Sequence, residues 1–258
     1  MTTTLASIAE HLNRLLGVSK IPDYPNAVNG IQCDHTGPVR AVASAVDASE
    51  QTIRLAAATG ANLLLVHHGL FWGGLQPLTE FRYSRLQLLF EHDMAVYSAH
   101  LPLDVHPKFG NSRLLADVLG LTVTGGFAYH ETVACGVQGT SDIATADLLK
   151  SVGAFSREHG GAARSTTLAP SHRTKRWAIC SGAGAGTSTL AEATADGIDT
   201  LVVGEGPHWT AVDAPERGLT IIYAGHYATE TLGVRAIGSI VADEFGIPHH
   251  AVDAPTGL

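Results

Sequence analysis

The chain has 258 residues, of which 45% are hydrophobic and 16% charged, a balance that is typical of a folded globular protein and excludes an intrinsically disordered one. Its formal net charge is −8 with no compensating lysine and arginine cluster, which argues against a nucleic-acid-binding protein. No apolar run approaches the ~20 residues of a transmembrane helix, and the N-terminus lacks the pattern of a signal peptide. Three scattered cysteines fit reduced thiols. We therefore expect a cytoplasmic protein that binds neither nucleic acid nor a membrane.

The first half of the chain predicts alternating helices and strands. Leu5, Ile8 and Leu12 recur at helical spacing behind Thr4, which predicts an N-capped helix that ends at Gly17. Similar patterns predict strands at 39–46, 61–66 and 94–99, and helices at 49–58, 84–92 and 112–119. This alternation is typical of an α/β fold with a largely parallel sheet.

Gly125-Gly126 predicts a hinge, after which the pattern starts again. The second half predicts strands at 133–138, 177–180 and 200–203, and helices at 141–152, 187–195 and 229–245. The small and polar residues of 157–172 predict an irregular edge or a mobile loop.

Histidines and carboxylates follow three of the apolar, strand-like runs. The run 61–66 leads into His67 and His68, the run 94–99 into His100 and Asp104, and the run 221–225 into His226 and Glu230. Ligands of open α/β sheets collect beyond the carboxyl ends of the strands, so these side chains predict a metal site there. For the two histidines of His67-His68 to converge, we expect the strand to end before them, since neighbouring strand residues point to opposite faces.

Imidazole together with carboxylate is the ligand set of borderline divalent ions, so we expect two ions, Zn²⁺ or Fe²⁺ before Mn²⁺ or Mg²⁺. One assignment gives the first ion His68, Asp104 and Glu230, and the second His67, His226 and a bridging Glu230. About three protein ligands per ion is the open arrangement of a catalytic site. Such a pair would supply a bridging hydroxide at neutral pH. The sequence leaves two roles open for His100, that of a direct metal ligand and that of a residue behind the ligands.

The chain resembles the Nif-three-like family of dinuclear metal-centre proteins, also labelled GTP cyclohydrolase I type 2 homologues. The matching stretches follow one another from end to end of the chain: 28–32 (VNGIQ), 66–72 (VHHGLFW), 98–104 (SAHLPLD), 110–111 (GN), 203–205 (VGE) with His208, and 225–230 (GHYATE). The resemblance implies metal ligands at His67, His68, Asp104, His226 and Glu230, in agreement with the spacing argument.

The resemblance also implies two intertwined α/β domains with mixed, mostly parallel sheets, helices on their faces, and the metal site in a cleft at the strand ends. We place the first domain at 1–124 plus 227–258 and the second at 125–226. The implied assembly is a toroidal homohexamer.

Further residues are candidates for catalysis or substrate binding. His100, Glu205 and His208 are candidate acid–base groups beside the metals. The loop 181–187 follows a strand and precedes a helix, where the backbone N–H groups of Gly182, Gly184 and Gly186 can bind phosphate. A tight structural turn is the competing interpretation, and the loop departs from both the Walker A and the dinucleotide patterns.

The first functional hypothesis is a metal-dependent hydrolase acting on a nucleotide or another phosphorylated small molecule, with GTP cyclohydrolase and phosphoesterase chemistry both open. Two divalent ions against two carboxylates leave a local charge of about +2, which favours a small anionic substrate. The second hypothesis is a non-catalytic, hexameric metal-binding regulator or scaffold. The third is a nucleotide-binding module built on the loop of Gly182, Gly184 and Gly186.

Overall fold

The computed structural model describes residues 3–166 and 169–258. The chain divides into two compact units, unit 1 (Met1–His106 and Gly233–Ala254) and unit 2 (Pro107–Leu232 and Pro255–Leu258). The chain thus leaves unit 1, forms unit 2 and returns. This division differs from the predicted boundaries near 124 and 227.

The described part of the chain carries no helix with the length and apolarity that crossing a bilayer requires.

Unit 1 contains a five-stranded sheet in the order β1-β4-β3-β2-β11. Its strands are β1 (Gly30–Cys33), β2 (Val42–Asp47), β3 (Leu63–His68), β4 (Ala95–Ser98) and β11 (His249–Ala251). Its helices are α1 (Leu5–Leu16), η1 (Pro25–Ala27), α2 (Glu50–Ala58), α3 (Glu80–Glu91), α4 (Leu101–Asp104) and the later part of α9 (His226–Phe245). Only the pair β1 and β4 is antiparallel, so this sheet is mostly parallel as predicted.

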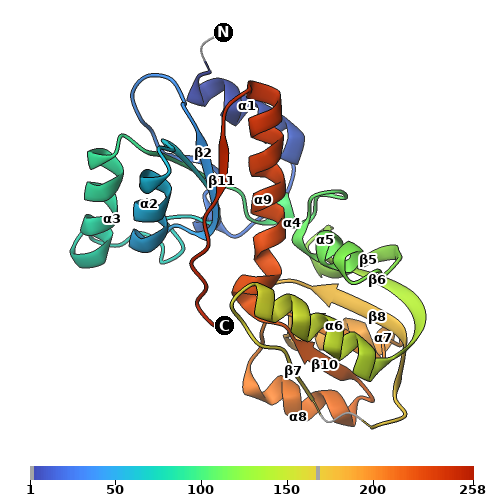
Figure 1. The fold of residues 1–258 in the computed structure, drawn as a ribbon. Coiled ribbons are helices and arrows are strands. Elements are labelled where there is room, and N and C mark those ends of the chain that lie inside the picture. The colour runs from blue at the N-terminus through green and yellow to red at the C-terminus, as the bar shows by residue number, and fades with distance from the viewer. Residues whose placement is uncertain (1–2, 167–168) are drawn as a thin grey trace. The chain divides into compact units, whose positions relative to one another are not determined.

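Helices cover both faces of the sheet in unit 1 (Figure 1). Ile53 of α2 and Leu89 of α3 pack with Leu64 and Val66 of β3 in one buried cluster. The predicted cap of the first helix is present, and the second helix is capped as well. The side chain of Thr4 accepts a hydrogen bond from the N–H of Ser7, and Ser49 forms a capping box with Thr52.

Unit 2 contains a six-stranded sheet in the order β5-β6-β8-β9-β10-β7. Its strands are β5 (Val123–His130), β6 (Val133–Ala144), β7 (Arg164–Ser165), β8 (Arg173–Cys180), β9 (Thr200–Val203) and β10 (Thr220–Tyr223). Its helices are α5 (Asn111–Val118), α6 (Thr145–Glu158), α7 (Thr187–Ala195), α8 (His208–Glu216) and the start of α9. Three of the five strand pairings are antiparallel, so the expectation of a mostly parallel sheet is wrong for this unit.

Alternate residues of the central strands bury two separate cores in unit 2. Trp177 and Ile179 of β8 pack with a cluster that includes residues of α5 and α6. Ala178 and Cys180 of the same strand pack with residues of α7 and α8. The six-stranded sheet is therefore covered by helices on both faces, which confirms the predicted α/β layering.

Two local predictions in this half are wrong. Gly125 and Gly126 are not a hinge, because both lie inside β5 and pair with Gln138 and Val137 of β6. The helix predicted from residue 141 begins only at Thr145, because β6 continues to Ala144 in its pairing with β8. In the stretch 157–172, helix α6 takes up the first two residues and the two-residue strand β7 forms an edge of the sheet, which agrees with the predicted irregular edge; residues 167–168 lie outside the described residues.

Candidate metal centre

In unit 1, two neighbouring strands bring three histidines to one edge of the sheet. Strands β3 and β4 are parallel and pair from Leu63 with Ala95 to Val66 with Ser98. His67 and His68 end β3, and His100 lies directly before α4. The ring centroid of His67 lies 4.8 Å from that of His68 and 4.9 Å from that of His100. One ring nitrogen from each of the three histidines lies within 4.8 Å of the others.

The predicted end of the strand before His67 is wrong. Strand β3 includes both histidines, because Asp47 of β2 pairs with His68 and the N–H of Ala48 donates to the His68 carbonyl oxygen at 2.9 Å. The pairing with β4, however, ends at Val66. His67 is fully buried and the side chain of His68 is 17% exposed, yet their rings lie together.

An oxygen atom fixes the Nδ1 atom of each of these three rings. His67 Nδ1 lies 2.9 Å from the Ala99 carbonyl oxygen, His68 Nδ1 lies 2.9 Å from Asp47 Oδ1, and His100 Nδ1 lies 2.8 Å from Asp23 Oδ1. Carbonyl and carboxylate oxygens only accept, so each Nδ1 donates and carries the proton. In a neutral imidazole the lone pair is then on Nε2, which is the state a metal ligand requires.

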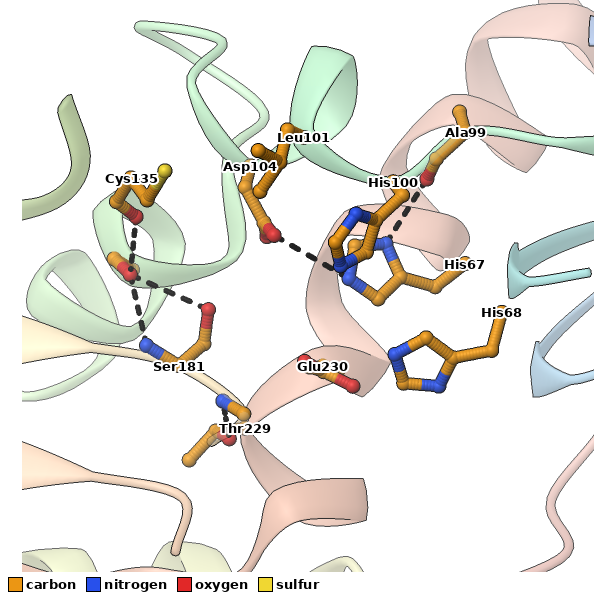
Figure 2. A network of polar contacts seen from close by, with 12 residues as sticks. His67, His68, Ala99, His100, Leu101, Asp104, Cys135, Ser181, Thr229 and Glu230 are labelled. Atoms are coloured by element: carbon orange, nitrogen blue, oxygen red, sulfur yellow. Dashed lines mark hydrogen bonds and ion pairs between the residues drawn. The ribbon is translucent and has the colours of Figure 1, made fainter. Parts of the chain in front are cut away.

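Asp104 lies at the end of the four-residue helix α4. Its Oδ2 atom is 3.4 Å from Nε2 of His67, and Figure 2 shows this contact beside the hydrogen bond from His67 to Ala99. The His67 side chain is fully buried and that of Asp104 is 8% exposed. Two electron-pair donors approach this closely in a buried site when a proton or a metal cation lies between them.

In unit 2, helix α9 begins at His226 and places Glu230 one turn later on the same face. His226 Nε2 lies 3.1 Å from Glu230 Oε2, and His226 Nδ1 lies 2.8 Å from Glu205 Oε1. The Glu230 side chain is only 4% exposed, whereas that of Glu205 is 44% exposed. Glu205 follows β9, the parallel neighbour of β10, so this group also gathers at the carboxyl ends of parallel strands.

The two carboxylates set the protonation of His226. Burial lowers the pKa of His226, but the hydrogen bonds and negative charges of Glu230 and Glu205 outweigh it and raise the pKa to about 9. Without a metal ion, the imidazolium form is therefore favoured at neutral pH. A divalent cation would have to displace this proton, which couples metal binding to proton release.

The glycine-rich loop of unit 2 packs against the first turn of α9. Gly182 has a φ of +61°, and a Cβ atom on it would lie 2.1 Å from Glu230 Oε1. The N–H groups of Gly182, Gly184 and Gly186 donate to Thr229 Oγ1, to the Gly182 carbonyl oxygen and to Thr189 Oγ1. All three donors have acceptors within the chain, as a tight turn requires, and phosphate binding by this loop stays a prediction.

The structure thus places the predicted residues in two groups. Unit 1 brings together His67, His68, His100 and Asp104, and unit 2 brings together Glu205, His226 and Glu230. His208 is the exposed first residue of α8, and its side chain has no hydrogen bond or ion pair among the described residues. Because the two groups belong to different units, a single centre of five ligands stays a prediction.

Two carboxylates that hold histidine rings, Asp47 and Asp23, were not among the predicted site residues. Asp47 ends β2, the parallel neighbour of β3, and so lies at the same edge of the sheet as the histidines. Its position after a strand-like apolar run could therefore have marked it in the same way as His67 and His68. Asp23 lies between two prolines in the loop before η1, where no periodicity marks it. Burial raises the pKa of Asp23, but its hydrogen bonds from His100, Asn29 and Tyr24 and the His100 charge lower it overall. Asp23 is therefore an ionised acceptor.

These donor sets fit divalent metal ions. Imidazole nitrogens with their Nδ1 atoms hydrogen-bonded to oxygen, next to buried carboxylates, are the usual surroundings of Zn²⁺ or Fe²⁺ in proteins. Both groups lie at strand ends, where ligands of open α/β sheets bind.

Comparisons with known proteins identify relatives over nearly the whole chain. The family model described as Duf34/NIF3 (NGG1p interacting factor 3) matches residues 3–256. A protein of Deinococcus radiodurans named GTP cyclohydrolase 1 type 2 homolog is 40% identical, with 96% of this chain and 94% of that protein covered. A protein of Halobacterium salinarum with the same name is 42% identical, with 93% of this chain and 94% of that protein covered.

Solved structures show the same fold. TTHA1606 from Thermus thermophilus superposes with a TM-score of 0.83 at 31% identity, and both chains are fully covered. A structure described as protein ybgI, of unknown function, superposes with a TM-score of 0.87 at 29% identity, again over the whole of both chains.

Proposed function

This chain belongs to the Duf34/NIF3 family, and from that premise we propose that it is a dinuclear metal-dependent hydrolase of small molecules. The proposed ligands are His67, His68, Asp104, His226 and Glu230. Zn²⁺ or Fe²⁺ is the proposed metal, with Mn²⁺ or Mg²⁺ as alternatives.

One observation carries the proposal. In each of four histidines, His67, His68, His100 and His226, the Nδ1 atom lies 2.8 to 2.9 Å from an oxygen acceptor. A buried histidine of the core needs one partner of any kind, whereas a ligand needs its second nitrogen kept as a lone pair and its ring held in place. The same arrangement in four rings at strand ends supports metal binding over packing.

The bound ions would supply Lewis-acid activation of water. The chain's own residues hold the ligand rings: Asp47 and the Ala99 carbonyl oxygen orient His68 and His67, and Glu205 orients His226. Because Glu205 is hydrogen-bonded to His226, we propose that Glu205 orients this ligand. His208, exposed at the start of α8, remains a candidate group for contact with substrate.

The names of the relatives are the basis of the proposed substrate class, a nucleotide or another phosphorylated small molecule. The charge of the site favours an anionic substrate less strongly than the two carboxylate ligands alone would. Asp47 and Glu205 bind ligand histidines and add negative charge to that of Asp104 and Glu230. With two divalent ions bound, the local charge is thus closer to zero than the value of about +2 that Asp104 and Glu230 alone would leave.

To test this proposal, the protein is purified without chelators and analysed for bound metals. It is then screened for turnover of nucleotides and phosphoesters, with the His68→Ala variant as the control. Formate release from GTP would identify cyclohydrolase chemistry, and phosphate release would identify a phosphoesterase. No turnover above the His68→Ala level would remove the enzyme proposal and leave the metal-binding regulator or scaffold.

The proposed assembly is a homohexamer. Size-exclusion chromatography with light scattering gives the mass of the assembly before and after the metal is removed with a chelator. A mass other than six chains would contradict the hexamer, and a hexamer that dissociates on chelation without any measured activity favours the scaffold function.

A further inference from the structure

Two aromatic side chains, Tyr24 and Trp72, lie beside the histidine rings of unit 1. The ring centroid of Trp72 lies 4.6 Å from that of His100 and 5.6 Å from that of His68, and both contacts are edge-to-face. The Tyr24 ring lies 6.1 Å from that of His100 and 6.4 Å from that of Trp72. We call Tyr24 and Trp72 the aromatic pair. A molecule that contacts this pair is therefore next to the proposed ligand His68.

The aromatic pair is only partly covered by the protein. Tyr24 is 51% exposed, and Trp72 is partly exposed. The Nε1 atom of Trp72 is nonetheless buried and has no hydrogen-bond partner among the described residues. A buried N–H without an acceptor costs stability, which a phenylalanine at this position would avoid. Packing alone therefore does not require an indole here, whereas a stacking surface for a planar ligand does use its larger aromatic face.

Hydrogen bonds from two side-chain amides fix the loop that carries Trp72. Gln32 Oε1 accepts from the N–H of Leu70 at 2.6 Å, and Gln32 Nε2 donates to the Ala27 carbonyl oxygen at 3.0 Å. Asn26 Nδ2 donates to the carbonyl oxygen of Trp72 itself at 3.4 Å. The main chain around the indole is thus held in place before a ligand arrives, which reduces the entropy lost on binding.

We propose that the aromatic pair binds the base of a nucleotide, with the base stacked on the indole of Trp72. The inference rests on the proposed function, which leaves a nucleotide and another phosphorylated small molecule open as substrates, and it favours the nucleotide. Stacking on an aromatic side chain suits a base, because every base has a π-face. A phosphorylated sugar has no such face and would gain little from the aromatic pair.

The first measurement compares two ligands that differ in the presence of the base. Guanosine monophosphate and ribose phosphate are titrated into the full-length protein by calorimetry, with bound metal and after its removal with a chelator. We expect guanosine monophosphate to bind at least about 10-fold more tightly in both states, because stacking of the base requires no metal. Equal affinities for the two ligands, or no binding of the nucleotide, would overturn the proposal.

Substitutions at Trp72 test the stacking itself. Trp72→Leu should weaken the binding of guanosine monophosphate by about 10- to 100-fold. Trp72→Phe keeps a smaller aromatic ring in the same place and should weaken this binding by less than about fivefold. The affinity for ribose phosphate should change in neither variant. An unchanged affinity of Trp72→Leu for the nucleotide would contradict stacking on the indole.

Tryptophan fluorescence reports the contact without relying on the leucine variant to fold. The chain has three tryptophans, of which Trp177 is fully buried and Trp209 lies in α8 of unit 2. Guanosine monophosphate should quench the emission of Trp209→Phe as it does that of wild type, and should quench that of Trp72→Phe much less. Quenching that Trp72→Phe leaves unchanged would remove Trp72 from the binding surface.

Phe71→Leu is the matched control for the loss of an exposed aromatic side chain. Phe71 directly precedes Trp72 in the same loop and is also exposed, but the described rings of the histidine cluster have their contacts with Trp72. We expect Phe71→Leu to bind guanosine monophosphate as wild type does. A loss equal to that of Trp72→Leu would show an effect of the loop and not of the indole, and would overturn the proposal.

The outcomes separate this inference from the proposed function. A protein that binds guanosine monophosphate through Trp72 but turns over no nucleotide would support the aromatic pair and remove the hydrolase. A Trp72→Leu variant that hydrolyses nucleotides with the KM of wild type would overturn the aromatic pair and leave the hydrolase standing. A Trp72→Leu variant that changes the mass of the assembly but binds the nucleotide as wild type does would also overturn it, and would assign Trp72 to a contact between copies of the chain.

Discussion

The Asp47 carboxylate lies 2.9 Å from Nδ1 of His68, although 21 residues separate them in the chain. The contact exists because β2 and β3 are parallel neighbours in register, with Asp47 opposite His68. Asp23 with His100 and Glu205 with His226 repeat the relation, at 2.8 Å each. A carboxylate that holds one nitrogen of a ring leaves the other for a metal ion, so these pairs connect the fold to the proposed chemistry.

Asp47→Asn should weaken Zn²⁺ binding by about 10–100-fold, because the neutral amide is a poorer acceptor for Nδ1 of His68 and no longer fixes the ring. Calorimetry on the metal-free protein measures this affinity. Asp243→Asn, an exposed site on α9, is the matched control and should bind as wild type does. Equal affinities for Asp47→Asn and wild type would exclude His68 as a ligand held by Asp47.

The metal-free protein should lose stability as the pH rises from about 6.5 to about 9. The pKa of His226 is raised to about 9 in the folded state from 6.5, so its stabilising contribution is complete below pH 6.5 and is lost as the pH passes 9. The loss should be on the order of 2 kcal/mol. Urea unfolding at several pH values measures it, and NMR titration of His226 gives the pKa directly.

Glu205→Gln should reduce this pH dependence, because it removes one of the two carboxylates that raise the pKa of His226. Glu216→Gln, an exposed residue of α8, is the control for the loss of one negative charge. A pH profile of Glu205→Gln identical to that of wild type would show that Glu205 does not hold His226.

Gly182→Ala should reduce both stability and metal binding. A side chain at a φ of +61° strains the backbone by about 1–3 kcal/mol, and the added Cβ would also displace the Glu230 carboxylate. Gly218→Ala is a matched control, because Gly218 has a φ of +71° with nothing within 4 Å of an added Cβ. We expect the two variants to share the loss of stability and only Gly182→Ala to lose metal affinity. Equal metal affinity in both would contradict the role of Gly182.

Much of the site followed from the sequence because its chemistry is local. His67 and His68 follow an apolar run, and His226 and Glu230 are four residues apart on a helix that ends at the predicted Phe245 but begins at His226, three residues before the predicted start. Helices α1 and α7 also have their predicted bounds, since caps and apolar periodicity decide them.

What the sequence did not reveal depends on pairing between distant segments. The residues 141–144 read as the start of a helix, but pairing with β8 makes them a strand. Asp23 reaches His100 over 77 positions from a loop, where no local pattern marks it. The antiparallel pairings of unit 2 likewise follow from strand order, which helix and strand alternation does not determine.

An anomalous-scattering map of crystals grown without chelators tests the central claim most directly, because it gives the element, its occupancy and its ligands together. We predict strong peaks bonded to His67 and His68 and to His226 and Glu230. A map of well-ordered crystals with no peak beside these side chains, from protein in which elemental analysis finds no bound metal, would contradict the account.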